Sequence, residues 1–359
     1  MPSCASCGAA DAASQCGGCH LVAYCGAPCQ RAHGPAHKAV CKAIKEDAAG
    51  EAAAGGRDPK RTHCDGCAAP LGVVDERCKG CRFASYCGAG CQRAHWRAGH
   101  KLVCKAVGEA KVARKRALAD AGDEGAMFYI ALYYRDGTGV VADAREAVSW
   151  YHRAAEAGHS DAQHNLGLCY ENGHGVNADA REAVRWYRRA AEAGDAAAQY
   201  NLGLCYRNGM GVASDAKEAV SWYRRAAAAG HAKAQHNLGF CYEKGRGVDA
   251  DALVAVSWYR RAAEAGYVEA QCNLGHCYES GTGVDVDARE AVRWYRRAAE
   301  TANAAAQYNL GRCYERGVGV DADALLAALW FERASAAAGD PLGAPQARAA
   351  LARLRAARQ

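Results

Sequence analysis

The sequence predicts two small metal-stabilised modules followed by an all-α solenoid of about six helix-turn-helix repeats of 36 residues. Two dense groups of cysteines predict the modules, and a tryptophan that recurs every 36 residues predicts the solenoid. Of the 20 cysteines in 359 residues, seven lie within 4–41, seven within 64–104, and the other six between 169 and 313. No apolar run resembles a signal peptide or reaches transmembrane length. We therefore expect no membrane contact and a reducing compartment, cytoplasm or nucleus, where clustered cysteines bind metal instead of forming disulfides.

Each cysteine cluster supplies eight soft metal ligands in four closely spaced pairs. Structural zinc binds four Cys or His side chains in a tetrahedron, so eight ligands predict two ions per cluster and four in the chain. The first cluster consists of Cys4, Cys7, Cys16, Cys19, Cys25, Cys29, His37 and Cys41. The second consists of Cys64, Cys67, Cys78, Cys81, Cys87, Cys91, His100 and Cys104. His33 is an alternative to His37, and His95 to His100. The His-x3-Cys spacing favours His37 and His100, because it places both ligands of a pair on one helical face.

The zinc predicted in these clusters is structural. Each segment has few large apolar side chains, so metal binding would supply most of its folding energy. Four protein ligands per ion leave no position for a reactive water, which argues against catalytic zinc. Seven thiolates and two zinc ions add −3 per cluster to a formal net charge of +6, which leaves the metallated chain close to neutral. The apparent basicity is therefore weak evidence for nucleic-acid binding.

The order of the ligand pairs resembles the MYND zinc finger over 4–41 and 64–104, including a tyrosine directly before the third pair, Tyr24 and Tyr86. The spacing alone leaves open which pairs share an ion. The resemblance implies two tandem cross-braced zinc fingers, in which the first and third pairs bind one ion and the second and fourth pairs bind the other. It also implies protein partners, since MYND fingers recognise short proline-containing peptides.

By the same resemblance, Gln92 and Trp96 of the second finger would contact the peptide. An exposed indole offers a proline ring a flat apolar surface and an N–H donor. The first finger has the equivalent Gln30 but carries Gly34 where the tryptophan would be. We therefore expect the second finger to bind a proline-containing peptide, and the first to be structural or to differ in specificity. The alternative for Trp96 is packing against its own finger.

Six copies of a 36-residue unit fill residues 123–338 and begin at Asp123, His159, Asp195, His231, Tyr267 and Asn303. In the third copy, apolar residues recur at helical spacing over 198–206 and again over 219–227, which predicts two helices per copy. The unit, with its Leu-Gly, Cys-Tyr, Gly-x-Gly-Val and Trp-Tyr-Arg-Arg elements, resembles the Sel-one-like repeat, a relative of the tetratricopeptide repeat. The resemblance implies a scaffold or adaptor.

Single residues mark the ends of the two helices in the third copy. Gly209 and Gly211 break the first helix, and Asp215 is the predicted N-cap of the second. Gly230 is its predicted C-cap. The small Gly203 is expected to let two helices approach closely.

The tryptophans and cysteines that share the 36-residue period are expected to pack between repeats. They are Trp150, Trp186, Trp222, Trp258, Trp294 and Trp330, and Cys169, Cys205, Cys241, Cys277 and Cys313. Equivalent atoms of neighbouring repeats lie about 10 Å apart, too far for a shared metal or a disulfide. Cys272 is outside this set and is predicted to be a free thiol. Its position holds His164, Tyr200, His236 and Tyr308 in other copies, and this variation indicates a position free of packing constraint that tunes a binding surface.

Three further segments connect or end these parts. Residues 42–63 have the composition of a flexible linker. Residues 105–122 are predicted to be a basic helical linker, although their KVARKR stretch (Lys111–Arg116) also fits a nuclear import signal or a nucleic-acid patch. Residues 339–359 are predicted to form a helix that caps the last repeat.

These features predict a zinc-binding protein-protein interaction adaptor, in which the second finger binds a peptide and the solenoid a larger partner surface. The alternative is a nucleic-acid-associated regulatory zinc-finger protein. The chain lacks a recognition-helix finger pattern and clustered exposed aromatics, so nucleic-acid binding is the weaker prediction. The segments outside fingers and repeats are too short for a catalytic core, and no nucleophile–base arrangement or phosphate loop is present, so we expect no enzymatic activity.

Overall fold

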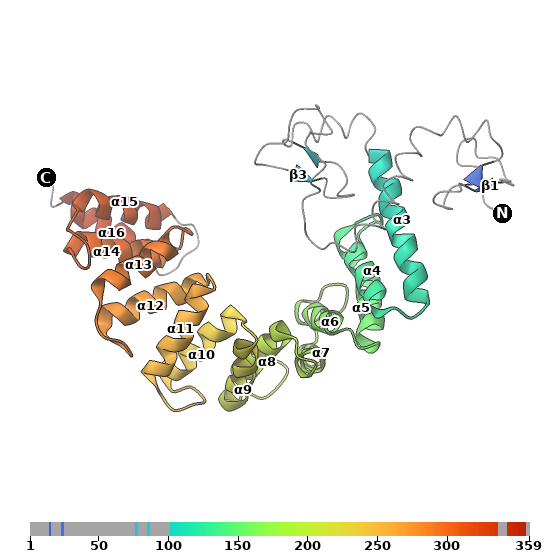
Figure 1. Cartoon of the computed structure of the whole chain (residues 1–359), viewed down its shortest axis with the longest axis horizontal. Helices are drawn as coiled ribbons and strands as arrows, with labels where there is room; N and C mark the ends of the chain where they lie inside the picture. The colour runs from blue at the N-terminus through green and yellow to red at the C-terminus, as the bar shows by residue number, and fades with distance from the viewer. Residues whose placement is uncertain are drawn as a thin grey trace. The chain divides into compact units, whose positions relative to one another are not determined.

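The computed structural model describes residues 101–336 and 343–356, together with four two-residue strands nearer the N-terminus (Figure 1). Side chains are described within 109–336, 345–354 and at 356. The chain divides into two compact units, Met1–Ala178 and Asp179–Gln359, and each is described by itself. No helix among the described residues combines the length and the apolar character that crossing a bilayer requires.

The four strands form two short hairpins. Strands β1 (Ser14–Gln15) and β2 (Ala23–Tyr24) pair antiparallel, with Ser14 opposite Tyr24. Strands β3 (Glu76–Arg77) and β4 (Ser85–Tyr86) pair in the same register, with Glu76 opposite Tyr86. The two strand pairs therefore share one register.

The predicted two-helix repeats are confirmed. The first helices of the six repeats are α4 (Glu124–Asp136), α6 (Ser160–Asn172), α8 (Ala196–Asn208), α10 (Ala232–Lys244), α12 (Val268–Ser280) and α14 (Ala304–Arg316). The second helices are α5 (Ala144–Glu156), α7 (Ala180–Glu192), α9 (Ala216–Ala228), α11 (Ala252–Glu264), α13 (Ala288–Ala299) and α15 (Ala324–Ala336). Each first helix begins directly after one of the six predicted starting residues, which serve as its N-cap. Tyr267 alone among these six caps makes no side-chain cap bond.

The second helices begin where the aspartates predict. Asp215 Oδ1 accepts hydrogen bonds from the backbone amides of Lys217 and Glu218 at 2.9 and 3.1 Å. The predicted C-cap of this helix, Gly230, is wrong by one residue, because the C-cap of α9 is Ala229. Gly230 follows the cap with φ +86°, a left-handed conformation that glycine adopts at little cost.

The core consists of buried clusters between a second helix and the first helix that follows it, as for α9 with α10, α11 with α12 and α13 with α14. In α9 the predicted apolar face is fully confirmed: Ala219, Val220, Tyr223, Ala226 and Ala227 are at most 2% exposed. They pack with Ala234, Leu238 and Cys241 of the next first helix, and Trp258 packs against this cluster from the following repeat. The periodic tryptophans and cysteines therefore pack between repeats, as predicted.

A buried glutamine ties each pair of neighbouring repeats together. Gln235 Nε2 of α10 donates to the carbonyl oxygen of Ala227 at 3.1 Å. The same bond recurs at 3.0–3.2 Å from Gln163, Gln199, Gln271 and Gln307. The carbonyl of Ala227 also accepts from the backbone amide of Gly230 at 3.1 Å, so the glutamine gives it a second hydrogen bond.

Two glycines of the repeat are required by close packing. A Cβ at Gly203 would lie 2.6 Å from Tyr223 Cε1, which confirms the predicted close approach of α8 and α9. A Cβ at Gly211 would lie 2.1 Å from the carbonyl oxygen of Ala180, and this glycine also has φ +69°. The Gly-x-Gly turn of each repeat therefore rests on the first turn of the preceding second helix.

Helices α3 (Lys101–Asp120) and α16 (Gly343–Ala356) pack against the first and last repeats. Arg116 Nη2 of α3 donates to Tyr134 Oη at 2.9 Å, a bond across 18 residues that recurs in later repeats. Helix α3 thus occupies the position that a second helix would take in a preceding repeat. At the other end, Ala347, Ala350 and Leu351 of α16 pack in a buried cluster with Phe331.

Candidate functional site

The predicted finger residues fall mostly outside the described residues. Cys104 lies in the first turns of α3, while the other fifteen predicted zinc ligands, Gln92 and Trp96 lie outside the residues that the structure describes. The family resemblance and the two hairpins therefore carry the argument for this part of the chain.

The described strands lie next to predicted ligands in each finger. Strand β1 ends directly before Cys16, and β2 ends directly before Cys25. In the second finger, β3 ends directly before Cys78 and β4 directly before Cys87, and the two strand pairs have the same register. These ligands lie outside the described residues, so the assignment of ligand pairs to ions stays a prediction.

Helix α3 joins the second cysteine cluster to the repeats. It begins at Lys101, contains Cys104, and continues without a break to Asp120. Its basic stretch takes part in packing: Lys115 lies over the ring of Tyr129 at 4.6 Å, and Arg116 bonds Tyr134. These contacts support the interpretation of the stretch as one face of a helix.

The variable position of the first helices is packed, so the interpretation that it is free of packing constraint is wrong. The ring of His236 lies 5.6 Å from the ring of Tyr259 and 5.2 Å from that of Tyr267. Cys272 is a free thiol, as predicted, and its Sγ donates to Asn303 Oδ1 at 3.5 Å. The position varies because a ring or a thiol can each fill the space between a tyrosine and the next repeat.

Burial suppresses the reactivity of the titratable groups at this position. It lowers the pKa of His236 below its ordinary value and raises the pKa of Cys272 to about 12. The thiol therefore stays protonated at neutral pH and is a poor nucleophile or metal ligand. Among the described residues, no group of three or more His, Cys, Asp or Glu side chains is arranged to hold a metal.

One buried tyrosine of the second helix lies beside a position of the preceding first helix that holds different residues in different repeats. Tyr259 Oη donates to Glu243 Oε2 at 2.6 Å, and Tyr295 Oη donates to Glu279 Oε2 at 2.7 Å. The buried Tyr223 hydroxyl has no hydrogen-bond partner, and the position equivalent to Glu243 is Arg207 in that repeat. The tyrosine itself does not reveal this difference, because the same residue stands at 223, 259 and 295.

Four pairs of adjacent arginines stand in the last turns of α7, α9, α11 and α13, and we name them the arginine row. They are Arg188, Arg189, Arg224, Arg225, Arg260, Arg261, Arg296 and Arg297, all exposed. The first arginine of each pair donates to a tyrosine hydroxyl of the next first helix, at 2.6, 2.8, 2.7 and 3.0 Å in chain order. The second lies over the tryptophan of its own helix, at 4.7, 4.5, 4.7 and 5.5 Å from the ring centre. Aromatic contacts therefore hold the row in position.

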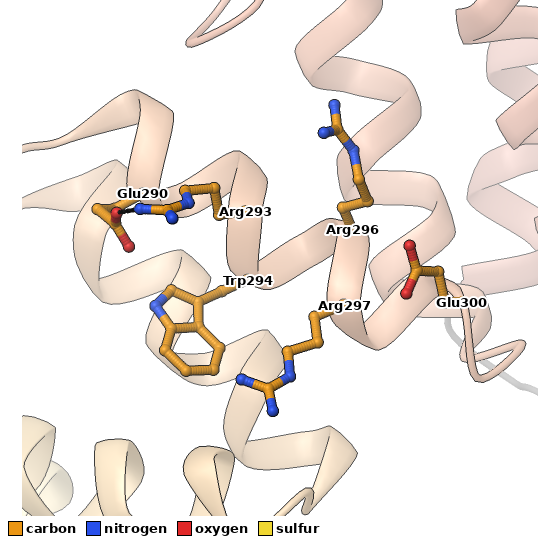
Figure 2. A pocket seen from close by; sticks show the side chains of 6 residues that line it. All are labelled: Glu290, Arg293, Trp294, Arg296, Arg297 and Glu300. Atoms are coloured by element: carbon orange, nitrogen blue, oxygen red, sulfur yellow. Dashed lines mark hydrogen bonds and ion pairs between the residues drawn. The ribbon is translucent and has the colours of Figure 1, made fainter.

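The row contains a surface hollow at α13, shown in Figure 2. The hollow has a volume of about 480 Å³ and is lined by Glu290, Arg293, Trp294, Arg296, Arg297 and Glu300. Arg293 forms an ion pair with Glu290 along the helix, and Arg297 lies beside the face of Trp294 (Figure 2). Three arginines against two glutamates leave the hollow positive. The sequence analysis treated these tryptophans only as packing residues and missed the arginines that accompany them.

The comparisons with known proteins agree with this architecture. A family model of the Sel1 repeat matches residues 125–159, 160–195, 196–231, 232–267, 268–301 and 304–338. A model of the MYND finger matches residues 4–41 and 61–104. No curated protein matches the chain.

Two solved structures are similar in sequence and fold. One is a protective antigen of uropathogenic Escherichia coli strains that displays an SLR fold, with 33% identity and a TM-score of 0.61. The match covers 67% of this chain and 56% of the antigen, so the chain spans little more than half of that protein. The other is a Sel1 repeat protein from Oxalobacter formigenes, with 35% identity, a TM-score of 0.56, and coverage of 64% and 99%.

Proposed function

The chain belongs to the Sel1 repeat family and carries two MYND fingers, and we propose on this premise that it is a non-enzymatic adaptor that joins protein partners. Both modules are non-catalytic protein-interaction modules. The single observation that carries the proposal is that these two kinds of module account for most of the chain.

The chemistry of the described residues supports a binding role. Burial raises the pKa of the repeat thiols, to about 11 for Cys277 and Cys313, so these side chains are suited to packing and not to nucleophilic attack. The arginine row and the hollow at α13 offer exposed, pre-positioned side chains on the solenoid. The free thiols also favour the proposed reducing compartment, cytoplasm or nucleus.

The fingers are zinc-binding domains, and we propose four zinc ions, two in each finger. The first and third ligand pairs of each finger would hold one ion and the second and fourth pairs the other. This pairing is what the resemblance to the MYND finger implies, and the family model matches both fingers. Native mass spectrometry of the intact chain would give the number of ions directly.

We further propose that the second finger binds a proline-containing peptide through Gln92 and Trp96. The test uses the full chain, because α3 runs from Cys104 into the first repeat and a cut after the finger would divide a helix. Zinc-loaded wild type and Trp96→Ala would be titrated with a library of short proline-containing peptides, with the zinc content of each measured. Selective binding that is lost in Trp96→Ala without loss of zinc supports the proposal.

The first finger provides a matched control. Gly34→Trp places an indole at the equivalent position of the other finger, where the preceding glutamine, Gln30, is already present. We expect this variant to gain a second peptide site. If Trp96→Ala binds peptides as well as wild type, the finger proposal fails. If Trp96→Ala releases zinc, Trp96 belongs to the core of its finger and not to a peptide site.

A further inference from the structure

The second helices of the repeats separate charge along their length. In α7, α9, α11 and α13 each helix starts after an aspartate N-cap and ends with an arginine pair. Asp215 and Arg224 are nine residues apart, which corresponds to about 14 Å along a helix. This exceeds the Debye length of about 8 Å at physiological salt. The arginine ends therefore present a positive field that the aspartates hardly reduce.

The positive field is strongest at α9. Glutamates accompany the arginine pairs of the other three helices, at Glu192, Glu264 and Glu300, whereas α9 has Ala228 at that position. Glu264 lies four residues after Arg260 and three after Arg261, on the same helical face, so the pair on α11 is partly compensated and the pair on α9 is not.

The arginines of α9 are ready to bind without reordering. Arg224 is held by its bond to Tyr242 Oη and Arg225 by the ring of Trp222. A guanidinium carries five N–H donors, so one bond to a tyrosine leaves most of them for other acceptors. Because these side chains are already positioned, less conformational entropy is lost when a partner binds.

We propose that the arginine row binds an acidic segment of a partner protein, with its centre at Arg224 and Arg225 on α9. The proposal rests on the adaptor function above and names the chemistry of one partner of the solenoid. Guanidinium groups bind carboxylates through paired, charge-assisted hydrogen bonds. Repeats stack at about 10 Å, and an extended peptide rises about 3.3 Å per residue, so about three residues of such a peptide span the distance between successive pairs.

The glutamates within the row favour a peptide over a nucleic acid or an anionic membrane. A phosphate backbone carries an even negative charge and would lie against Glu192 and Glu264 as well as the arginines. A peptide can place acidic side chains at the arginine pairs and neutral side chains beside the glutamates. The row therefore fits an acidic peptide better than a uniform polyanion.

Fluorescence anisotropy with the full-length, zinc-loaded chain tests the proposal. The probe is labelled octaglutamate, with octaglutamine, a short oligodeoxythymidylate and phosphatidylserine vesicles as comparisons. We expect octaglutamate to bind in a salt-dependent manner and Arg224→Gln with Arg225→Gln to weaken binding by about tenfold or more. The matched control, Arg260→Gln with Arg261→Gln, removes the compensated pair and should weaken octaglutamate binding by about threefold or less.

A second variant guards against a folding effect of the arginine changes. Ala228→Glu, at an exposed position, gives α9 the glutamate that accompanies the arginine pairs of α7, α11 and α13 and leaves both arginines in place, and it should also weaken octaglutamate binding. The proposal is overturned if octaglutamate does not bind, if the α9 and α11 variants lose binding equally, or if the oligonucleotide or the vesicles bind more tightly. Octaglutamate contains no proline, so Trp96→Ala should leave its binding unchanged, and the two proposals can fail separately.

Discussion

Removing one hydroxyl from two equivalent tyrosines is expected to change stability in opposite directions. Tyr259 and Tyr223 are both 0% exposed and occupy the same position of neighbouring repeats. Tyr259 Oη donates to Glu243, whereas Tyr223 Oη has no hydrogen-bond partner. The sixth repeat already has Phe331 at this position, so a phenylalanine ring is compatible with the packing.

The expected magnitudes follow from these contacts. A hydrogen bond to a charged acceptor contributes about 1.5–3 kcal/mol, so Tyr259→Phe should lower the free energy of unfolding by about 2 kcal/mol. A buried hydroxyl without a partner costs about 1–3 kcal/mol, so Tyr223→Phe should raise stability by about 1 kcal/mol. The two variants should therefore differ by about 3 kcal/mol, although the same atom is removed from each.

Urea unfolding followed by circular dichroism at pH 7 measures the difference, and hydrogen exchange of α10 and α12 localises it. Exchange is needed because repeat arrays can unfold in parts, and a single midpoint then averages over them. Equal destabilisation by both variants would refute the reasoning, because it would mean that the Tyr223 hydroxyl is satisfied in solution.

The pH dependence of the Tyr259 variant provides an independent check. Burial tends to raise the pKa of Glu243, but hydrogen bonds from Lys244 and Tyr259 outweigh it and hold the pKa below its ordinary value of 4.5. A carboxylate with a lowered folded-state pKa contributes stability above its unfolded pKa, and this is lost as pH falls through the folded value. The difference in the free energy of unfolding between wild type and Tyr259→Phe should therefore be largest near pH 7 and should shrink below pH 4.5.

Three further outcomes are expected. Gly247→Ala should lower the free energy of unfolding, measured in urea, by more than about 3 kcal/mol, since its Cβ would lie 2.2 Å from the carbonyl oxygen of Ala216. Gly230→Ala has nothing within 4 Å of its Cβ and should lower it by only about 1 kcal/mol, the strain of a left-handed backbone. Deleting residues 340–359 should lower the melting temperature because it uncovers the buried ring of Phe331, and an unchanged melting curve would contradict a capping role for α16. Chelating zinc should reduce hydrogen-exchange protection in the first turns of α3, which contain a predicted ligand, and should leave the protection of α9 to α13 unchanged. If the protection of α3 is the same with and without the chelator, zinc binding does not stabilise the start of this helix.

The repeat architecture could be predicted because each copy contains the same helix-ending residues and a similar spacing of apolar residues. The six starting residues are the N-caps of the six first helices, and the apolar positions of 219–227 are the buried face of α9. Capping and helical periodicity act over a few residues, so they are visible in the sequence. The fingers could be predicted for a similar reason, since ligand spacing over short loops carries the metal chemistry, and the family models agree.

The partners of individual side chains depended on neighbours that the local sequence does not show. Cys272 and His236 vary between copies in the manner of surface residues, yet both fill space against the next repeat. The tyrosines look equivalent in sequence, but Tyr259 donates to a glutamate of the preceding first helix, whereas Tyr223 has Arg207 at the equivalent position.

The sequence by itself determined the kinds of module and their order, because caps, ligand pairs and helical period are short-range properties. Only the tertiary structure showed that arginines, tryptophans and tyrosines from different helices form one exposed row, and that a single helix joins Cys104 to the first repeat. These features bring together residues up to 18 positions apart, at distances set by helix packing and not by any local preference of the chain.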